Sequence, residues 1–250
     1  MSPRVPHRFY FAGHLAQQSE ELVALSRDES HHLLHVLRLK PGTQVDLFDA
    51  AGRSWSAEVV DQVEGQARLR LLYHFEEQSG TPTGINLAVA VLKRRAMDLM
   101  IEKLTELGVE TIQPLLSARC VGLPDIAPHQ ETPPRWDRIA LAAAKQSGRT
   151  VPLNILRPAP VGDWLERMRP PAHTVFAHDA YDAQTIGHWA VQSAGSTSPV
   201  WVAIGPEGGW TDDEAKAFEQ AGFDAVRMGD LTLRAETAAI AAAALCRLVR

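Results

Sequence analysis

The amino-acid sequence predicts an α/β protein with a small β-rich unit at its N-terminus and a larger unit built on a parallel sheet. Residues 44–73 hold three short segments of alternating polar and apolar residues, which is typical of antiparallel strands. From Ile85 onward, apolar runs alternate with segments of helical spacing, which is the pattern of βαβ units. A polar stretch rich in glycine and proline, residues 76–84, separates the two patterns and predicts a linker between two domains.

The composition narrows the class of protein only modestly. The chain has 250 residues, of which 45% are hydrophobic and 22% charged, as expected for a globular protein with one large or two small domains. Its net charge is −5, whereas proteins that bind nucleic acid usually carry a basic excess. A local basic patch is still compatible with this balance, because the distribution of charge governs attraction. The sequence shows no signal peptide and no membrane-spanning run, so we expect a cytoplasmic protein.

The N-terminal unit, residues 1–75, is predicted to be a small β-barrel with one helix. We expect Asp28 or Ser30 to cap this helix and Pro41-Gly42 to end it. The apolar residues of the helix are Leu33, Leu34, Val36 and Leu37. The strands are predicted at residues 44–49, 54–60 and 67–73.

Neither the histidines nor the cysteines predict a metal site. His31 and His35 share a helix face, as zinc ligands can, but a metalloprotease pattern needs Glu where His32 stands, and no third ligand is evident. A solvated or RNA-facing turn is the better interpretation. Cys120 and Cys246 lack C-x-x-C spacing, so we expect buried apolar cysteines without a disulfide.

The larger unit, residues 85–250, begins with a strand, a helix and a second strand. The first strand is predicted at Ile85–Leu92, the helix ends at Gly108, and Val109–Leu116 forms the second strand. Later elements are a proline-rich loop at 121–134, a helix at 136–148, strands at 173–178, 200–204 and 224–228, a connector at 192–199, and a final helix at 235–250. The final helix is apolar almost all round, which predicts burial on every side.

A loop with three glycines, Gly205-Pro-Glu-Gly-Gly-Trp210, follows the strand Val200–Ile204. Thr211 and Glu214 form the pattern of a capping box, which starts a helix directly after the loop. Glycines let the backbone approach a ligand closely, and open α/β sheets bind ligands at the carboxyl ends of their strands. The spacing fits neither the dinucleotide motif nor the P-loop.

The charge around this loop also argues against phosphate binding. Glu207, Asp212, Asp213 and Glu214 crowd the start of the helix and would repel an anion. A neutral or cationic ligand held by backbone groups is favoured, and a plain glycine turn before a capped helix is the alternative. A second turn, Gly229-Asp-Leu-Thr-Leu-Arg234, leads into the final helix, where polar side chains need partners or a ligand.

Two segments carry a resemblance to a known family. Ile204-Gly-Pro-Glu-Gly-Gly-Trp210 with Glu214, and Leu233-Arg-Ala-Glu-Thr-Ala238, resemble the paired signatures of the 16S ribosomal RNA uridine-N3 methyltransferases (RsmE type) of the SPOUT superfamily. The resemblance implies a C-terminal SPOUT trefoil-knot domain, an N-terminal PUA-like barrel that contacts RNA, S-adenosylmethionine as cofactor, and a homodimer acting on 16S rRNA within the 30S subunit. A knot is an exception to the rule that chains do not thread loops.

The sequence departs from the family's pattern at four positions. Trp210 stands where the family usually has Phe, Met228 where Leu is common, Ala235 where Thr is frequent, and Asp179 where Glu is usual. The first three concern packing around the cofactor, whereas the last makes the role of that carboxylate less certain.

The resemblance also assigns candidate residues for the cofactor and for catalysis. Arg234 is expected to stabilise the anion that forms when uridine N3 loses its proton, and Glu236 or Glu207 to accept that proton. For Glu236 a purely structural role at the helix N-terminus is the alternative. The cofactor-binding candidates are Ile204, Gly205, Pro206, Glu207, Gly208, Gly209, Met228, Gly229, Leu231, Leu233, Thr237 and His178.

Basic and polar residues scattered over both units are the candidates for RNA contacts. The alternative for each of them is an ordinary solvated charge. Arg119 is expected to lie with them at the edge of the RNA-binding surface. For Lys145 and Arg149 a favourable charge beside the helix end at Gly148 is a second alternative. The candidates are Arg8, His32, Arg38, Arg53, Lys93, Arg94, Lys145, Gln146 and Arg149.

Two other functions are compatible with the sequence. One is a SPOUT enzyme that methylates a ribose 2′-hydroxyl or another base, since the same cofactor loops would serve it. The other is a non-catalytic RNA-binding protein that keeps the barrel. The position of the methyl group in the RNA product distinguishes the first alternative from a uridine-N3 methyltransferase. Binding of the cofactor distinguishes a methyltransferase from the second alternative.

Overall fold

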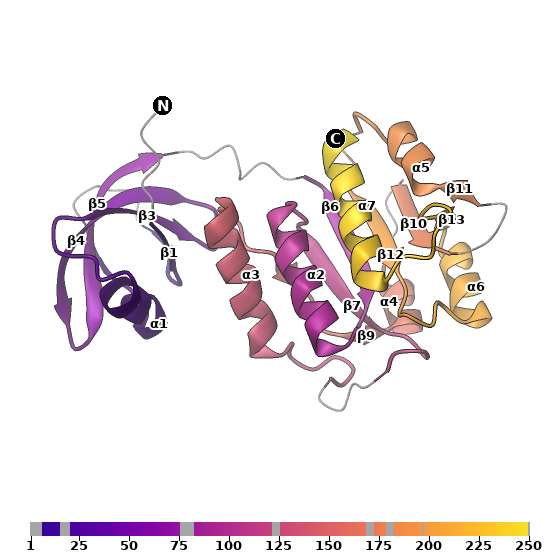
Figure 1. Cartoon of the computed structure of the whole chain (residues 1–250), viewed down its shortest axis with the longest axis horizontal. Coiled ribbons are helices and arrows are strands. Elements are labelled where there is room, and N and C mark those ends of the chain that lie inside the picture. Colours follow the sequence, from indigo (N-terminus) through magenta and orange to yellow (C-terminus); the bar gives the residue numbers. More distant parts are fainter. Residues whose placement is uncertain are drawn as a thin grey trace. The chain divides into compact units, whose positions relative to one another are not determined.

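The computed structural model describes residues 7–15, 21–75, 83–121, 126–168, 173–178, 183–196 and 198–249. The chain divides into two compact units (Figure 1). The first comprises Met1–Thr81 and Ala144–Pro152, and the second comprises Pro82–Ala143 and Leu153–Arg250. Most of the predicted linker and Asp179 lie outside the described residues. The segment Ala144–Pro152 thus joins the first unit, although its place in the sequence is inside the second.

The first unit is a five-stranded, barrel-like sheet in the order β1-β3-β4-β5-β2. The β1 strand runs parallel to β3, and the other neighbouring pairs are antiparallel. Apolar residues at alternate positions, such as Phe9, Leu47 and Leu69, are fully buried in one core. The strands are β1 (Arg8–Phe11), β2 (Leu22–Ala24), β3 (Gln44–Asp49), β4 (Ser54–Val63) and β5 (Gln66–Phe75).

The helix of this unit starts earlier than predicted. It consists of α1 (Arg27–His31) and a π-helical turn, η1 (His32–Val36). The predicted cap at Asp28 or Ser30 is wrong, because Ser26 accepts the hydrogen bond from the Glu29 backbone N–H at 3.3 Å. Ser30 is instead fully buried, and its hydroxyl accepts a hydrogen bond from the backbone N–H of Ala67 on β5 at 2.9 Å. Because the Ser30 hydroxyl bonds to the sheet in this way, Ser30 does not cap the helix.

The second unit is built on an eight-stranded parallel sheet, which confirms the predicted fold class. Its strands follow the order β11-β13-β10-β12-β6-β7-β8, and β9 pairs with β7. Every pair is parallel. The strands are β6 (Ile85–Ala90), β7 (Thr111–Leu116), β8 (Asn154–Ile155), β9 (Ala159–Pro160), β10 (His173–Ala177), β11 (Gln184–Thr185), β12 (Val200–Ile204) and β13 (Asp224–Arg227).

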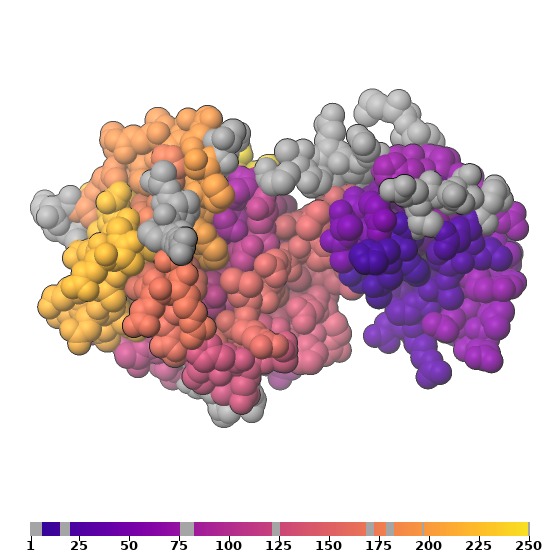
Figure 2. Space-filling model, turned by 180° about the vertical axis from the view of Figure 1, so that it is seen from behind, coloured from indigo at the N-terminus to yellow at the C-terminus, as the bar shows by residue number. Residues whose placement is uncertain are grey.

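Helices cover both faces of this sheet. On one face α7 packs beside α2 and α5, as Figure 1 shows, and on the other α4 packs beside α6, as Figure 2 shows. Along β6, Leu87 and Val89 enter the core of the first face, whereas Ala88 and Ala90 enter the core of the second. The helices are α2 (Arg94–Glu106), α3 (Pro134–Ser147), α4 (Val161–Arg167), α5 (Ile186–Gln192), α6 (Asp212–Gln220) and α7 (Ala235–Val249).

The final helix, α7, is buried on one face only, so the prediction of burial on every side is wrong for this chain. Ala239, Ala242 and Ala243 on its inner face are fully buried. Leu248 near its end is 83% exposed. The inner face packs on α2, α5, β6 and β12.

Candidate functional site

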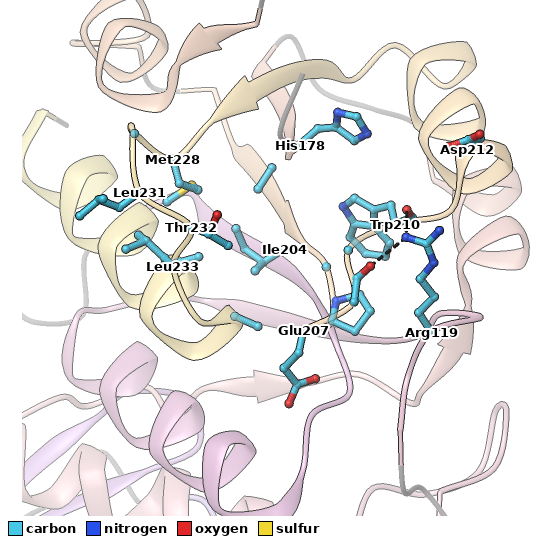
Figure 3. Close-up of a pocket in the computed structure, with 18 residues that line it drawn as sticks. Arg119, His178, Ile204, Glu207, Trp210, Asp212, Met228, Leu231, Thr232 and Leu233 are labelled. Atoms are coloured by element: carbon cyan, nitrogen blue, oxygen red, sulfur yellow. Dashed lines mark hydrogen bonds between the residues drawn. The ribbon is translucent and has the colours of Figure 1, made fainter. Parts of the chain in front are cut away.

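The ends of three neighbouring strands and the start of α7 enclose a cavity of about 340 Å³ in the second unit (Figure 3). The strands are β10, β12 and β13, and because they run parallel their carboxyl ends meet at the same edge of the sheet. The cavity is lined by Arg119, Ala177, His178, Ile204, Gly205, Pro206, Glu207, Gly208, Gly209, Trp210, Asp212, Met228, Gly229, Leu231, Thr232, Leu233, Ala235 and Ala238.

The two turns singled out in the sequence, residues 205–210 and 229–234, therefore meet at one cavity. All the cofactor-binding candidates line it except Thr237, which is exposed. The lining also contains residues that the sequence did not indicate as cofactor contacts, among them Arg119, Trp210 and Asp212. Trp210 belongs to the glycine motif itself, so its position beside the glycines could have indicated that it lines the cavity.

The glycine turn owes its shape to two of its glycines. Gly209 has a φ of +70°, a conformation that other residues rarely adopt, and its N–H donates to the carbonyl of Pro206 at 2.8 Å. Gly205 lies against the indole of Trp210, so that a Cβ at this position would come within 3.1 Å of the ring. The turn is thus closed upon itself and packed against its own aromatic residue.

Arg119 fixes the turn from the neighbouring segment after β7. Its Nη1 donates to the carbonyls of Gly208 at 2.8 Å and Trp210 at 3.0 Å (Figure 3). The expected role of Arg119 at an RNA-binding rim stays a prediction, but its guanidinium already holds the glycine turn. Carbonyls that accept from Arg119 are directed toward it, which orients the peptide units of the turn.

Glu214 fixes the residues that follow the turn. The predicted capping box is confirmed: Thr211 Oγ1 accepts from the Glu214 N–H at 3.2 Å, and Glu214 Oε2 accepts from the Thr211 N–H at 2.9 Å. The same carboxylate accepts from the hydroxyl of Ser117 at 3.0 Å and from the N–H of Ala118 at 2.9 Å. The second half of the glycine turn and the helix start that follows it are therefore both joined to residues 117–119.

The lining combines apolar side chains with acidic ones. Ile204, Met228 and Leu233 give the cavity apolar walls, and Glu207 and Asp212 add two carboxylates. Among the described lining residues Arg119 carries the only guanidinium or ammonium group, and it is engaged by two carbonyls. The balance of charge favours a ligand with positive charge over a phosphate. The carboxylate of Glu207 points away from the centre of the cavity (Figure 3).

The two catalytic candidates lie beside the cavity but do not line it. Arg234 is exposed and is flanked by the lining residues Leu233 and Ala235, and its carbonyl accepts from the N–H of Ala238 at 2.9 Å to start α7. Glu236 is partly exposed in the first turn of α7. Both residues are thus adjacent in sequence to residues of the lining.

Several RNA-binding candidates of the first unit have partners within that unit. Lys145 Nζ lies 2.8 Å from Oε1 of the buried Glu29, and Arg53 Nη2 lies 2.6 Å from Oδ2 of the fully buried Asp49. The guanidinium of Arg8 lies over the Phe48 ring at 4.8 Å. Arg149 is only 8% exposed, and its Nε donates to the carbonyl of Val151. These contacts give each of the four a structural role in the unit.

The other candidates are more accessible. Arg38 is exposed and has a φ of +54°, and Lys93, Arg94 and Gln146 are exposed as well. His32 is partly buried, and this burial, followed by the nearby ammonium of Lys145, lowers the pKa of His32 below its usual range. Of the nine candidates, the exposed side chains are the ones that need no rearrangement to reach a phosphate.

The histidine pair and the cysteines show no further site. The rings of His31 and His35 lie 5.0 Å apart, and among the described residues no group of three or more His, Cys, Asp or Glu is placed to hold a metal ion. Neither cysteine forms a disulfide; Cys246 is buried, and partial burial raises the pKa of the Cys120 thiol. None of the helices in the described ranges has the length and hydropathy needed to cross a membrane.

The fold and the cavity define a class, that of α/β proteins with a ligand site at the carboxyl edge of a parallel sheet, here preceded by a small β unit. Comparison with protein-family models identifies the family within this class. Residues 79–247 match the RNA methyltransferase domain, and residues 25–71 match the RNA methyltransferase PUA domain.

Relatives agree with this match over most of the chain. A ribosomal RNA small subunit methyltransferase E from Synechocystis sp. is 33% identical over 88% of this chain and 70% of its own length. The protein of that name from Rickettsia conorii is 28% identical over 97% of this chain and 96% of its own length. The chain belongs to the family of RNA methyltransferases that includes the ribosomal RNA small subunit methyltransferases E.

Solved structures show the same fold. The structure of a ribosomal RNA small subunit methyltransferase E from Neisseria gonorrhoeae, bound to S-adenosylmethionine, superposes with a TM-score of 0.82 at 29% identity and covers 95% of each chain. A Legionella pneumophila methyltransferase in complex with the same cofactor superposes with a TM-score of 0.84 at 26% identity and covers 98% of each chain.

Proposed function

We propose that this protein transfers a methyl group from S-adenosylmethionine to N3 of a uridine in 16S rRNA, which is uridine 1498 in conventional rRNA numbering. One observation carries the proposal: the two turns that resemble the family's signatures, residues 205–210 and 229–234, line one cavity at the carboxyl edge of the parallel sheet. Membership of the RNA methyltransferase family supports the reaction class.

The cavity suits this cofactor in size and charge. A volume of about 340 Å³ falls within the range of small-molecule sites. S-adenosylmethionine carries a sulfonium and no phosphate, which agrees with a lining whose one described guanidinium, that of Arg119, is engaged by two carbonyls and whose acidic residues are Glu207 and Asp212. Backbone groups of the two turns would hold it, together with His178, Ile204 and Met228. We also propose that these turns form the family's trefoil knot.

When bound, S-adenosylmethionine supplies a methyl group on a positively charged sulfur that leaves as a neutral thioether. Uridine N3 holds a proton at neutral pH, and its loss leaves negative charge on O2 and O4. We assign Arg234 to stabilise this charge, because a guanidinium suits a delocalised oxyanion. Glu236 or Glu207 accepts the proton. Holding the uridine N3 in line with the methyl group provides the remaining catalysis.

The partners follow from the same proposal. We infer a cytoplasmic homodimer that acts on 16S rRNA in the 30S subunit. The strongly exposed apolar side chains of Leu231 and Leu248, at 79% and 83%, are consistent with burial against a second copy. The exposed residues Arg38, Lys93 and Arg94 are the foremost candidates for phosphate contacts, and Arg8, His32, Arg53, Lys145, Gln146 and Arg149 are the others.

Two measurements test this function. Calorimetric titration with S-adenosylmethionine is expected to show binding at one site per chain; an absence of binding would favour a non-catalytic RNA-binding protein. Mass spectrometry of 16S rRNA, after incubation of purified 30S particles with the protein and the cofactor, is expected to show one methyl group on a uracil base. A methyl group on a ribose, or on another base, would contradict the proposed substrate.

A further inference from the structure

One buried polar atom at the cavity has no hydrogen-bond partner among the described residues. The indole Nε1 of Trp210 is buried and makes no hydrogen bond within the part of the chain that the structure describes. Trp210 is only 5% exposed and belongs to the lining of the cavity. Buried donors are nearly always paired, so an unpaired one beside a ligand site calls for an explanation.

Packing explains the ring of Trp210 but not its N–H group. The indole lies 4.9 Å from the ring of Phe218, centroid to centroid, within the core between the sheet, α4 and α6. The nitrogen lies on the edge of the indole that packs on Gly205, 3.3 Å from where a Cβ of that residue would stand. In Figure 3 this edge is turned toward the side of the cavity where His178 and Ile204 lie.

The surroundings of the N–H group indicate which part of a ligand it meets. Ala177, Ile204 and Met228 give this side of the cavity apolar walls beside the imidazole of His178, whereas the carboxylate of Asp212 belongs to the start of α6. An apolar wall suits an uncharged group, because a charged group would lose its hydration there without compensation. The nucleoside half of S-adenosylmethionine is uncharged and carries hydroxyls and ring nitrogens that accept hydrogen bonds.

We propose that Trp210 Nε1–H donates a hydrogen bond to an uncharged acceptor of the cofactor's nucleoside half. The inference rests on the proposed function, since it needs S-adenosylmethionine in this cavity. The contact forms with a small movement of the glycine turn, because the nitrogen is covered by its neighbours. Trp210 is then a binding residue whose donor finds a partner in the ligand, which strengthens the complex without stabilising the protein alone.

The experiment compares Trp210→Phe with the matched control Trp201→Phe. Trp201 lies on β12, packs on Trp164 at 5.4 Å and does not line the cavity. Calorimetry is run with S-adenosylmethionine and with 5′-methylthioadenosine, which lacks the charged amino-acid half. We expect Trp210→Phe to weaken both ligands by roughly tenfold, as one hydrogen bond does, and Trp201→Phe to weaken neither. In the wild type, the indole N–H resonance that Trp210→Phe removes should shift downfield with either ligand.

The outcomes separate the two proposals. Wild-type affinity in a Trp210→Phe protein with an unchanged melting temperature, or an indole resonance that neither ligand shifts, would overturn the role of Trp210 and leave the proposed function intact. Weakening of S-adenosylmethionine alone would place the acceptor in the amino-acid half and overturn the assignment to the nucleoside. A wild-type protein that binds neither ligand would overturn the proposed function itself.

Discussion

The carboxylate of Glu214 accepts a hydrogen bond from the hydroxyl of Ser117, 97 residues earlier in the chain, at 3.0 Å. It also caps α6, whose start follows the glycine turn directly. One side chain therefore joins the turn that lines the cavity to the segment after β7. Because Arg119 holds the carbonyls of the same turn, the geometry of the cavity depends on this neighbouring segment.

Glu214→Gln tests this connection. Glutamine keeps one acceptor oxygen but replaces the other by an NH₂ group, which cannot accept from Ser117, Ala118 or Thr211. We expect a loss of about 1–3 kcal/mol in the free energy of unfolding and weaker cofactor binding. Thermal unfolding and calorimetry measure the two effects. Glu219→Gln, at the exposed far end of α6, is the control. Equal behaviour of the two variants would contradict the connection.

Arg119→Gln separates the shape of the turn from the stability of the fold. The side chain is exposed, so we expect little change in melting temperature. The carbonyls of Gly208 and Trp210 lose their shared donor, and we expect KM for the cofactor to rise roughly tenfold while kcat changes less. Arg157→Gln, which removes another exposed arginine of the same unit, should leave KM unchanged. A KM equal to that of the wild type in Arg119→Gln would show that the turn holds its own shape.

Arg234→Ala tests the proposed stabiliser of the uridine anion. Arg234 does not line the cavity, so the variant should bind S-adenosylmethionine as the wild type does. Methyl transfer to 30S particles should fall at least a hundredfold, because a stabiliser of developing charge acts mainly on the chemical step. Arg247→Ala, near the exposed end of the same helix, is expected to keep its turnover. Unchanged turnover in Arg234→Ala would remove this residue from the mechanism.

Asp49→Asn is expected to destabilise the first unit. The fully buried carboxylate accepts from the N–H groups of Leu15, Ala51 and Arg53 and from the Arg53 guanidinium. Burial alone would raise the pKa of Asp49, but these donors hold it below its usual range. Loss of the charge should lower the free energy of unfolding of the first unit by about 3–5 kcal/mol, measured by hydrogen exchange of its amides. Asp61→Asn, which breaks the exposed pair with Arg68, serves as the control and should cause no comparable loss.

His32 makes the stability of the first unit depend on pH. Burial lowers its pKa, as do Lys145, His7 and His31, while Glu29 acts in the opposite direction. A lowered pKa means that the unfolded chain binds the proton more readily, so stability falls as the pH drops below the ordinary value of 6.5. Between pH 7 and pH 5 we expect His32→Gln to lose less stability than the wild type. Parallel curves in thermal unfolding would contradict this.

The sequence predicted the longer strands and helices, because their periodicity is local, but it did not indicate the shorter elements β1, β2, β8, β9, β11, α4 and α5. It failed at the helix cap of the first unit, since the burial of Ser30 depends on its bond to Ala67 in a distant strand. It also failed for α7, because an apolar helix can be covered on one face only. The motif around Gly205 and the turn at Gly229 predicted most of the cavity lining for the same local reason.

The contacts that the sequence did not predict depend on how elements distant in the chain come together in the fold. Arg119 reaches the glycine turn because β7 pairs with β6, and β6 with β12, which no spacing in the chain reveals. Thr237 lies outside the lining because Ala235 and Ala238, three residues apart on one face of α7, point toward the cavity instead. Likewise, the pairing of Lys145 with Glu29 joins residues 116 apart.

The return of Ala144–Pro152 to the first unit limits how this protein can be taken apart. A fragment of residues 1–75 would lack Lys145 and would leave the buried carboxylate of Glu29 without its counter-ion. A chimera that exchanges this barrel for that of a relative has to exchange the end of α3 with it. Dividing the chain only between β5 and β6 would therefore separate side chains that stabilise each other.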